Sequence, residues 1–181
     1  KEDSIRDVTI QWSIISEGLY CSTHSEGCHS KGMLLGSDDS QRFSIHHNLY
    51  AHNYTRSPRI NTTGVVDVVN NVVYNYKYEL VSSVVINEFA KGKVNYVNNY
   101  VKAGRGTMDG KYFISTDNRG GTGFDLYVKG NISPNRPNDN MAEDLVVKSK
   151  ARKYVTNKRP SAPQVTTTSA KDAYNQVLAG A

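Results

Sequence analysis

The amino-acid sequence predicts an all-β protein folded as a parallel β-helix, a single-stranded solenoid of roughly five coils followed by a C-terminal peptide and a short helix. Along the chain, a short β-branched or aromatic strand, a polar pair and a second apolar strand recur as one unit. Aligned on the polar pair, the units repeat after 35, 23, 28 and 32 residues. Such intervals fit a coil of somewhat over ~20 residues with loop insertions, and strand-only units favour a β-helix over a helical array.

The five units share one internal order, with a polar residue at the bend between the two strands. They cover residues 7–15, 43–50, 66–74, 94–101 and 126–132, with Ser13, Asn48, Asn71, Asn99 and Asn131 at the bend. Asn tolerates left-handed backbone dihedral angles, and its amide can hydrogen-bond the same amide of the next coil. We therefore interpret the four asparagines as a structural ladder rather than as a binding row.

Aromatic and histidine residues in the predicted strands have a structural interpretation. Aromatic side chains of a stacked coil mostly fill the core or stack between coils, and a sugar platform is the less common alternative. The residues concerned are Trp12, Tyr74, Tyr96 and Tyr100. His46 and His47 would lie on alternate faces of one strand, where a packed, hydrogen-bonded histidine is the expected role of at least one.

The character of the sequence changes after Asn131. Four prolines, at positions 134, 137, 160 and 163, punctuate a stretch rich in Asn, Lys, Ser and Thr, which predicts a long peptide lying over the coils. Ser169, three residues before Asp172, resembles a capping box and predicts the start of a short helix. This helix is expected to dock through Ala173, Tyr174, Val177 and Leu178. The coils would span 1–133 and the extension 134–181 of the same domain.

The charge balance favours an anionic partner. The chain has 22 Lys and Arg against 17 Asp and Glu, a formal net charge of +5 and an isoelectric point near 9.1. Nucleic acid, acidic polysaccharide and anionic lipid all fit this balance. No apolar run approaches the ~18 residues of a membrane span or resembles a signal peptide. Because the sequence opens on Lys1 without a leader, we expect a mature product or a fragment.

The two cysteines enclose a short polar stretch. Cys21 and Cys28 could close a surface loop as a disulfide in an oxidising compartment, which is the favoured interpretation. With His24 and His29 alongside, a zinc site is an alternative, although structural zinc usually uses more closely spaced cysteine pairs and four clear ligands. Free thiols are the third alternative.

Two basic motifs carry the functional prediction. Residues 31–37 read Lys-Gly-Met-Leu-Leu-Gly-Ser, and residues 56–59 read Arg-Ser-Pro-Arg. Lys31 and Arg56 are 25 positions apart, close to one coil. Because successive coils stack about 4.8 Å apart, the two side chains could face one cleft on neighbouring turns. The alternative is that Arg56 and Arg59 are solvated surface charges.

These two motifs and residues 44–50, Ser-Ile-His-His-Asn-Leu-Tyr, resemble the pectate lyases of polysaccharide lyase family 1, which fold as right-handed parallel β-helices. The resemblance implies that Arg56 is the base that removes the C5 proton of a galacturonate in β-elimination. It implies that Lys31 and Arg59 bind the substrate carboxylate. Some family members carry a further arginine where this chain has Asn61.

The resemblance also implies a cofactor, a partner and a location. The family binds Ca²⁺ through acidic residues that precede the segment with which this chain opens, so we expect no metal ligand here and expect the family's N-terminal coils upstream. The implied protein is secreted and monomeric, and acts on de-esterified polygalacturonate. Nucleic-acid binding is not expected, since the basic residues are scattered and the aromatics that could stack on bases lie in core strands. A membrane partner is not expected either, since no long apolar run is present.

The chemistry of the implied site constrains its pH dependence. A guanidinium has a pKa above ~12 and is normally protonated. Neighbouring cations would favour its deprotonated form, so activity is expected to rise above neutral pH. Cations or a divalent metal would also neutralise the charge that builds up beside the substrate carboxylate.

Two rival functions remain open. Asp38 and Asp39 are candidates for a polygalacturonase-like hydrolase, which needs an acid and a base about 6.5–9.5 Å apart, but no third acidic partner is seen. A non-catalytic β-helix that binds acidic glycans is the other rival. Glycosylation sequons at Asn53, Asn61 and Asn131 matter if the source glycosylates secreted proteins.

Overall fold

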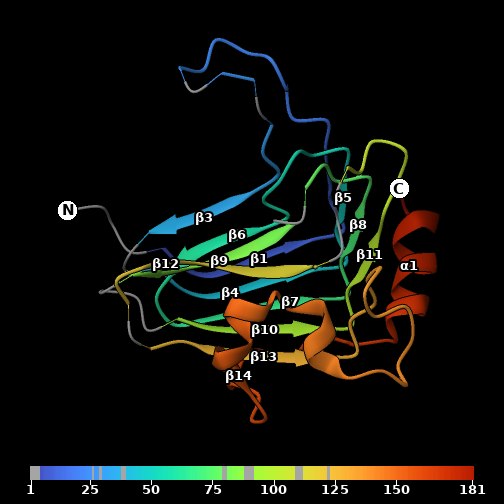
Figure 1. Cartoon of the computed structure of the whole chain (residues 1–181). Coiled ribbons are helices and arrows are strands. Elements are labelled where there is room, and N and C mark those ends of the chain that lie inside the picture. Colours follow the sequence, from blue (N-terminus) through green and yellow to red (C-terminus); the bar gives the residue numbers. More distant parts are fainter. Residues whose placement is uncertain are drawn as a thin grey trace.

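A computed structural model of the chain shows stacked parallel strands that wind into a solenoid (Figure 1). The structure describes residues 5–25, 27–28, 30–37, 40–78, 81–87, 92–108, 112–121 and 123–181. Within these ranges the strands form three parallel sheets, and each full coil contributes one strand to each sheet. This arrangement confirms the predicted parallel β-helix.

Within each sheet, neighbouring strands come from successive coils of the solenoid. The first sheet contains β1 (Arg6–Gln11), β4 (Gln41–His46), β7 (Val65–Val69), β10 (Lys93–Val97), β13 (Asp125–Lys129) and β14 (Val155–Thr156). The second contains β2 (Ile14–Ser16), β5 (Leu49–Ala51), β8 (Val72–Tyr74) and β11 (Tyr100–Lys102). The third contains β3 (Leu34–Ser37), β6 (Arg59–Thr62), β9 (Ser82–Asn87) and β12 (Ile114–Arg119). The repeat predicted the first two sheets, whereas the third lies in the segments interpreted as insertions.

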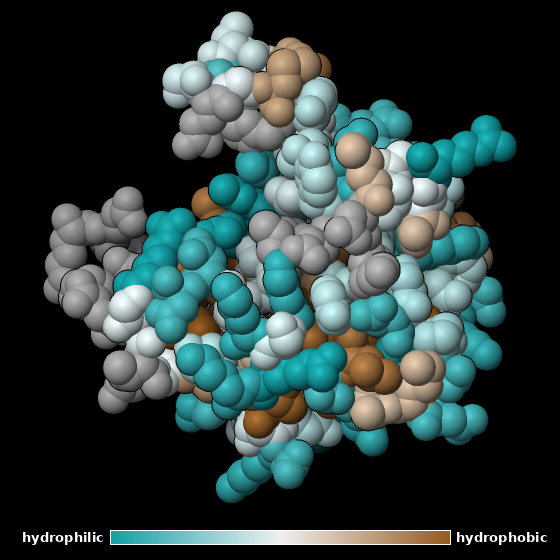
Figure 2. Space-filling view, viewed as in Figure 1, coloured by the Kyte–Doolittle hydropathy of each residue, from teal (hydrophilic) through white to brown (hydrophobic). Residues whose placement is uncertain are grey.

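The core consists of apolar side chains that repeat at the same position of each coil. Phe43, Val66, Val94 and Leu126 are register partners along the first sheet, and all four are buried. Burying a side chain of this size contributes roughly 1.5–3 kcal/mol. Outward positions are mainly polar, and Figure 2 shows a largely hydrophilic face with small, separate apolar areas.

The predicted asparagine ladder is present inside the solenoid. The side-chain amide of Asn48 donates to Asn71 Oδ1 (2.9 Å), that of Asn71 to Asn99 Oδ1 (3.0 Å) and that of Asn99 to Asn131 Oδ1 (2.8 Å). In each of these three pairs, the backbone N–H of the donor asparagine also donates to the Oδ1 atom that accepts its side-chain amide. All four residues are buried, so the ladder joins four consecutive coils inside the solenoid.

The expectation that the ladder residues themselves take up left-handed dihedral angles is wrong. The left-handed residue is the one before each ladder position. These residues are Trp12, His47, Asn70, Asn98 and Gly130, with φ between 49° and 64°. The chain therefore bends at the residue before each ladder position. The ladder asparagine follows the bend, and its amide points inward toward the next coil.

The C-terminal segment both covers the coils and extends them. β14 pairs with β13, and Val147 forms a parallel bridge with Ile114 of the third sheet. One 3-10 helix, η1 (Glu143–Val146), directly precedes Val147, and a second, η2 (Ser149–Tyr154), lies between the two contacts. The segment is therefore partly a continuation of the solenoid rather than only a peptide lying over it.

The final helix, α1 (Ala170–Ala179), begins where the sequence predicted and packs beside β8 and β11 (Figure 1). Ser169 Oγ accepts the backbone N–H of Asp172 at 3.1 Å. Ala173 and Val177 are buried, but Leu178 is 40% exposed, so its predicted docking role is wrong because it lies on the outer side of the helix. No helix in the described ranges has the length and apolar character needed to cross a membrane.

The aromatic residues divide between core and surface. Tyr96 is fully buried, and its hydroxyl lies 2.7 Å from Ser82 Oγ, as expected of a core residue. Trp12 is 55% exposed, so of the two structural roles expected for it, filling the core and stacking between coils, it has the second. It occupies the left-handed bend of the first coil, and its ring stacks on His47 with centroids 4.7 Å apart.

Candidate functional site

The two basic motifs lie against each other on neighbouring coils. Lys31 forms a parallel bridge with Thr55, and the Gly32 N–H donates to the Thr55 carbonyl at 3.0 Å. The Met33 N–H donates to the Arg56 carbonyl at 2.7 Å. Lys31 and Arg56 are therefore one coil apart at the start of the third sheet, the spacing that the sequence predicted, and both are half-buried.

Gly32 allows this close approach. A Cβ atom built at position 32 would lie 2.7 Å from the carbonyl oxygen of Arg56 and 3.1 Å from Ser57 Oγ. Arg56 has φ +65°, in the left-handed region. The second motif thus bends sharply into β6, and the glycine of the first motif leaves room for that bend.

Arg59 projects from β6 onto the outer face of the third sheet, where it meets a carboxylate. Its Nη2 donates to Asp117 Oδ2 on β12 at 2.5 Å, and its Nη1 lies 3.4 Å from Ser83 Oγ on β9. Arg119 also donates to Asp117, at 3.1 Å. Burial would raise the pKa of Asp117, but hydrogen bonds from both arginines outweigh this effect and hold the pKa below its ordinary value.

Asp117 is a site residue that sequence reasoning missed. It lies 58 residues after Arg59 and two coils away, on a strand that the repeat did not predict. A search for the third strand of each coil could have found it, because the register pairs Arg59 with Ser83 and Ser83 with Ser115, two residues before Asp117 on the same strand. Arg59, Arg119 and Asp117, with Lys31 and Arg56 at the strand start, are called the basic face below.

The predicted histidines lie away from the basic face. His46 is the last residue of β4 and His47 lies in the following bend, so they are not both strand residues as expected. Their Nδ1 atoms are 2.9 Å apart. Burial lowers the pKa of both imidazoles, and the charge of His46 lowers that of His47 further. The pair is a packed, hydrogen-bonded unit between the first and second sheets.

The structure joins Cys21 and Cys28 in a disulfide, with Cα atoms 4.2 Å apart. Both sulfur atoms are thereby engaged, so neither is a thiolate ligand for zinc in this form. Among the described residues, no group of three or more His, Cys, Asp or Glu side chains could hold a metal ion. His29, Asp38 and Asp39, named as candidates above, lie outside the described residues.

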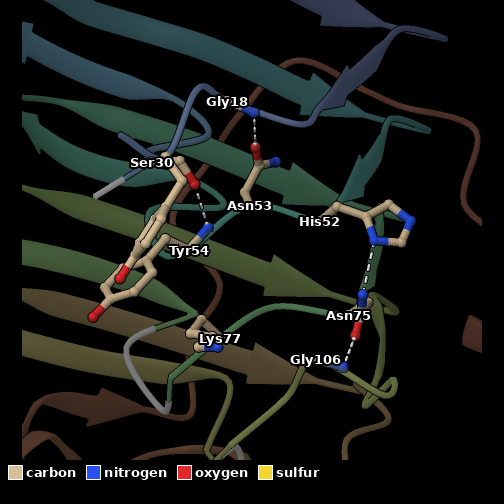
Figure 3. A pocket seen from close by; sticks show the side chains of 9 residues that line it. Gly18, Ser30, His52, Asn53, Tyr54, Asn75, Lys77 and Gly106 are labelled. Carbon is tan, nitrogen blue, oxygen red and sulfur yellow. Dashed lines mark hydrogen bonds between the residues drawn. The ribbon is translucent and has the colours of Figure 1, made fainter. Parts of the chain in front are cut away.

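A cleft of about 220 Å³ opens next to the start of the two motifs (Figure 3). It is lined by Gly18, Tyr20, Ser30, His52, Asn53, Tyr54, Asn75, Lys77 and Gly106. Ser30 directly precedes Lys31, and Tyr54 directly precedes Thr55, its bridge partner. Sequence reasoning missed this cleft because its residues come from the connections between the second and third sheets.

Two of the three sequon asparagines are inaccessible in the folded chain. Asn53 is 3% exposed, with its amide donating to the Ile15 carbonyl and its oxygen accepting from the Gly18 N–H. Asn131 is the buried end of the ladder. Asn61 is half-exposed on β6, so it is the sequon residue that a glycan could reach without unfolding.

Comparison with known proteins adds no family assignment. No protein-family model matches the chain. No curated protein matches it either. The resemblance to pectate lyases accordingly rests on the motif residues and on their arrangement along the coils.

Proposed function

We propose that the chain acts on de-esterified polygalacturonate as a pectate lyase, with Arg56 as the base and Lys31 and Arg59 as carboxylate-binding cations. One observation carries the proposal. The motifs that contain Lys31 and Arg56 are joined by backbone hydrogen bonds across one coil step, and Arg59 follows on the adjoining strand. Cations on two neighbouring coils suit a polymer that carries one carboxylate per sugar.

The proposed reaction is a β-elimination. The C5–H bond of a galacturonate breaks, a C4–C5 double bond forms, and the C4–O glycosidic bond breaks. The departing oxygen takes up a proton to give one product, and the unsaturated uronate is the other. Negative charge builds up on the uronate carboxylate during this step, so the cations of the basic face would stabilise the transition state more than the ground state.

Arg59 already has a carboxylate partner within the protein. Because Arg59 already donates to Asp117, a substrate carboxylate would have to share it or displace the internal partner. This pairing favours a second candidate function, a β-helix that binds acidic glycans without cleaving them. The two functions differ in one observable, the appearance of unsaturated product.

The calcium requirement is part of the same proposal and rests on the resemblance alone. The described residues include no cluster suited to a metal, so no step is assigned to calcium here. Secretion is likewise part of the proposal, and the Cys21–Cys28 disulfide supports it because disulfides persist in oxidising compartments.

The deciding experiment measures ultraviolet absorbance of the unsaturated product with polygalacturonate, with added calcium and with a chelator. Arg56→Lys keeps the positive charge but not the planar guanidine group, and Lys31→Ala removes the lysine that would bind the substrate carboxylate. Lys129→Ala is the matched control, since Lys129 is an exposed cation on β13, away from the basic face.

We expect both site variants to lose at least about a hundredfold in rate and the control to keep full activity. Undiminished product from Arg56→Lys would end its assignment as the base. Binding of polygalacturonate by the unaltered chain without any product, with calcium present, would favour the glycan-binding function instead.

A further inference from the structure

Three tyrosines stack beside the basic face. The rings of Tyr20 and Tyr54 are stacked, with centroids 5.4 Å apart and an interplanar angle of 30°. The ring of Tyr78, in the following coil, meets Tyr54 edge-on at 5.0 Å. Tyr20 is 47% exposed, and Tyr54 is half-exposed. The stack therefore presents aromatic surface to solvent rather than filling the core.

The position of Tyr54 is fixed by its backbone. Its N–H donates to Ser30 Oγ at 3.0 Å (Figure 3). Its carbonyl accepts the Lys77 N–H at 3.2 Å. The buried amide of Asn53, directly before it, ties the same coil to residues 15 and 18 of the preceding coil. Tyr20 is adjacent to the Cys21–Cys28 disulfide, which restrains its loop.

Polar groups line the opposite side of the cleft in defined orientations. The Gly106 N–H donates to Asn75 Oδ1 at 2.7 Å, which places the Asn75 amide nitrogen 2.7 Å from His52 Nδ1. Because that nitrogen can only donate, Nδ1 of the neutral His52 must accept and Nε2 must carry the proton. The exposed imidazole therefore offers a hydrogen-bond donor that a sugar oxygen could accept.

Lys77 adds a positive charge to the cleft. It is half-buried and lies below Tyr54 in Figure 3. Within the described ranges, no salt bridge pairs its ammonium group with a carboxylate. Exposed tyrosine rings and a cation in one cleft are complementary to a sugar ring that carries a carboxylate.

We propose that this cleft is a sugar subsite that holds one uronate ring of an acidic polysaccharide, packed on Tyr54, with its carboxylate on Lys77. The inference rests on the proposed function for its substrate class. Tyr54 directly precedes Thr55, which forms the bridge with Lys31. A sugar ring in the cleft would therefore belong to the same polysaccharide molecule that crosses the basic face.

The stack suits the alkaline conditions expected for the reaction. A hydrogen bond with Tyr78, together with burial, raises the pKa of Tyr54 to about 12. The phenol stays neutral well into the alkaline range, so it does not become an anion that repels a polyuronate.

The test measures dissociation constants for galacturonate oligomers of two to six units with the whole chain, by calorimetry in the presence of chelator. Tyr54→Leu removes the aromatic face, Tyr54→Phe keeps it, and Lys77→Gln removes the cation. Tyr127→Leu on β13 is the matched control, since Tyr127 is half-exposed like Tyr54, and a neutral glucan of equal length tests the need for carboxylates.

We expect Tyr54→Leu and Lys77→Gln to weaken binding of the hexamer by about tenfold and that of the dimer by much less. Tyr54→Phe and Tyr127→Leu should bind like the unaltered chain, and thermal unfolding midpoints should confirm that each variant folds. If Tyr54→Leu and Lys77→Gln bind the hexamer as tightly as the unaltered chain does, the subsite proposal is overturned and the proposed function is not. No binding of any galacturonate oligomer by the unaltered chain, with calcium as well as with chelator, would overturn the proposed function too.

Discussion

The carbonyl oxygen of Arg56 lies where a Cβ atom on residue 32 would meet it at 2.7 Å, so the two basic motifs interlock only because position 32 is glycine. Real Cβ contacts are not this short, and the obstructing atom belongs to the backbone, which cannot rotate away. A single missing side chain therefore determines how closely Lys31 and Arg56 approach across the coil step.

Gly32→Ala should separate the motifs. We expect a loss of about 1–3 kcal/mol in the free energy of unfolding, because the added methyl group overpacks a tight contact. If the proposed function holds, lyase activity should also fall at least about tenfold. Urea unfolding and the product assay measure the two effects.

Gly36→Ala is the control for this change. It alters the same motif, but a Cβ there would make only ordinary contacts with the Leu34 side chain, at 3.4–3.7 Å. A Gly32→Ala variant as stable as Gly36→Ala would contradict the close approach of the two coils.

Replacing the middle of the asparagine ladder should be strongly destabilising. Asn71→Leu removes the bonds to Asn48 and Asn99 and leaves buried amide groups unpaired on both sides. Each unpaired group costs roughly 1–3 kcal/mol, so we expect a loss of about 2–5 kcal/mol in denaturant unfolding. Asn140→Ala, in an exposed loop, should change stability by less than about 0.5 kcal/mol. Equal stability of the two variants would show that the ladder contributes nothing.

Asp117→Asn should release Arg59 for an external carboxylate. At neutral pH, affinity for polygalacturonate is expected to rise about threefold at low salt, because one competing negative charge is removed. Retardation in gels that contain the polymer measures the effect. Weaker binding in the variant would indicate that the carboxylate positions Arg59 rather than competing for it.

The depressed pKa of Asp117 gives this pair a defined pH dependence. A carboxylate whose folded-state pKa lies below its unfolded value stabilises the fold above the unfolded pKa of about 3.9 and loses that effect as pH falls through the folded pKa. The stability difference between the unaltered chain and Asp117→Asn should therefore shrink upon acidification below about pH 4. A difference that stays constant to lower pH would contradict the shift.

Trp12 should report the protonation of His47. Trp12 is the single tryptophan in the sequence, and its ring lies 4.7 Å from that imidazole. Because the folded-state pKa of His47 is lowered, the neutral form is favoured: its stabilising effect is complete above about pH 6.5 and declines as pH falls toward the folded pKa. Tryptophan fluorescence should change with a midpoint below about pH 6.5, and His47→Asn should abolish that change. A midpoint above this value would contradict the burial of the imidazole.

The proposed guanidine base predicts an alkaline activity profile. The rate of formation of unsaturated product should rise from about pH 7 to about pH 10, because a larger fraction of the guanidine is then deprotonated. The measurement is the initial rate at constant ionic strength. A maximum near pH 5 would contradict Arg56 as the base.

Periodicity made the first two sheets and the ladder predictable. Asn48, Asn71, Asn99 and Asn131 recur because an amide that bonds to its own copy must occupy the same place in every coil. The third sheet has no such marker. Its strands follow connections of different lengths, so their alignment could not be read from the chain alone.

The sequence by itself determined the solenoid, the coil spacing and the likeness of its two basic motifs to a lyase site, since each is a local pattern or a pattern repeated at coil spacing. Only the tertiary structure decided that Gly32 locks those motifs together, that Asp117 neutralises Arg59, and that Tyr20 and Tyr54 stack over a cleft. These contacts join residues from different coils with no repeating pattern. Such pairs become neighbours only when the register of every intervening strand has been fixed by packing.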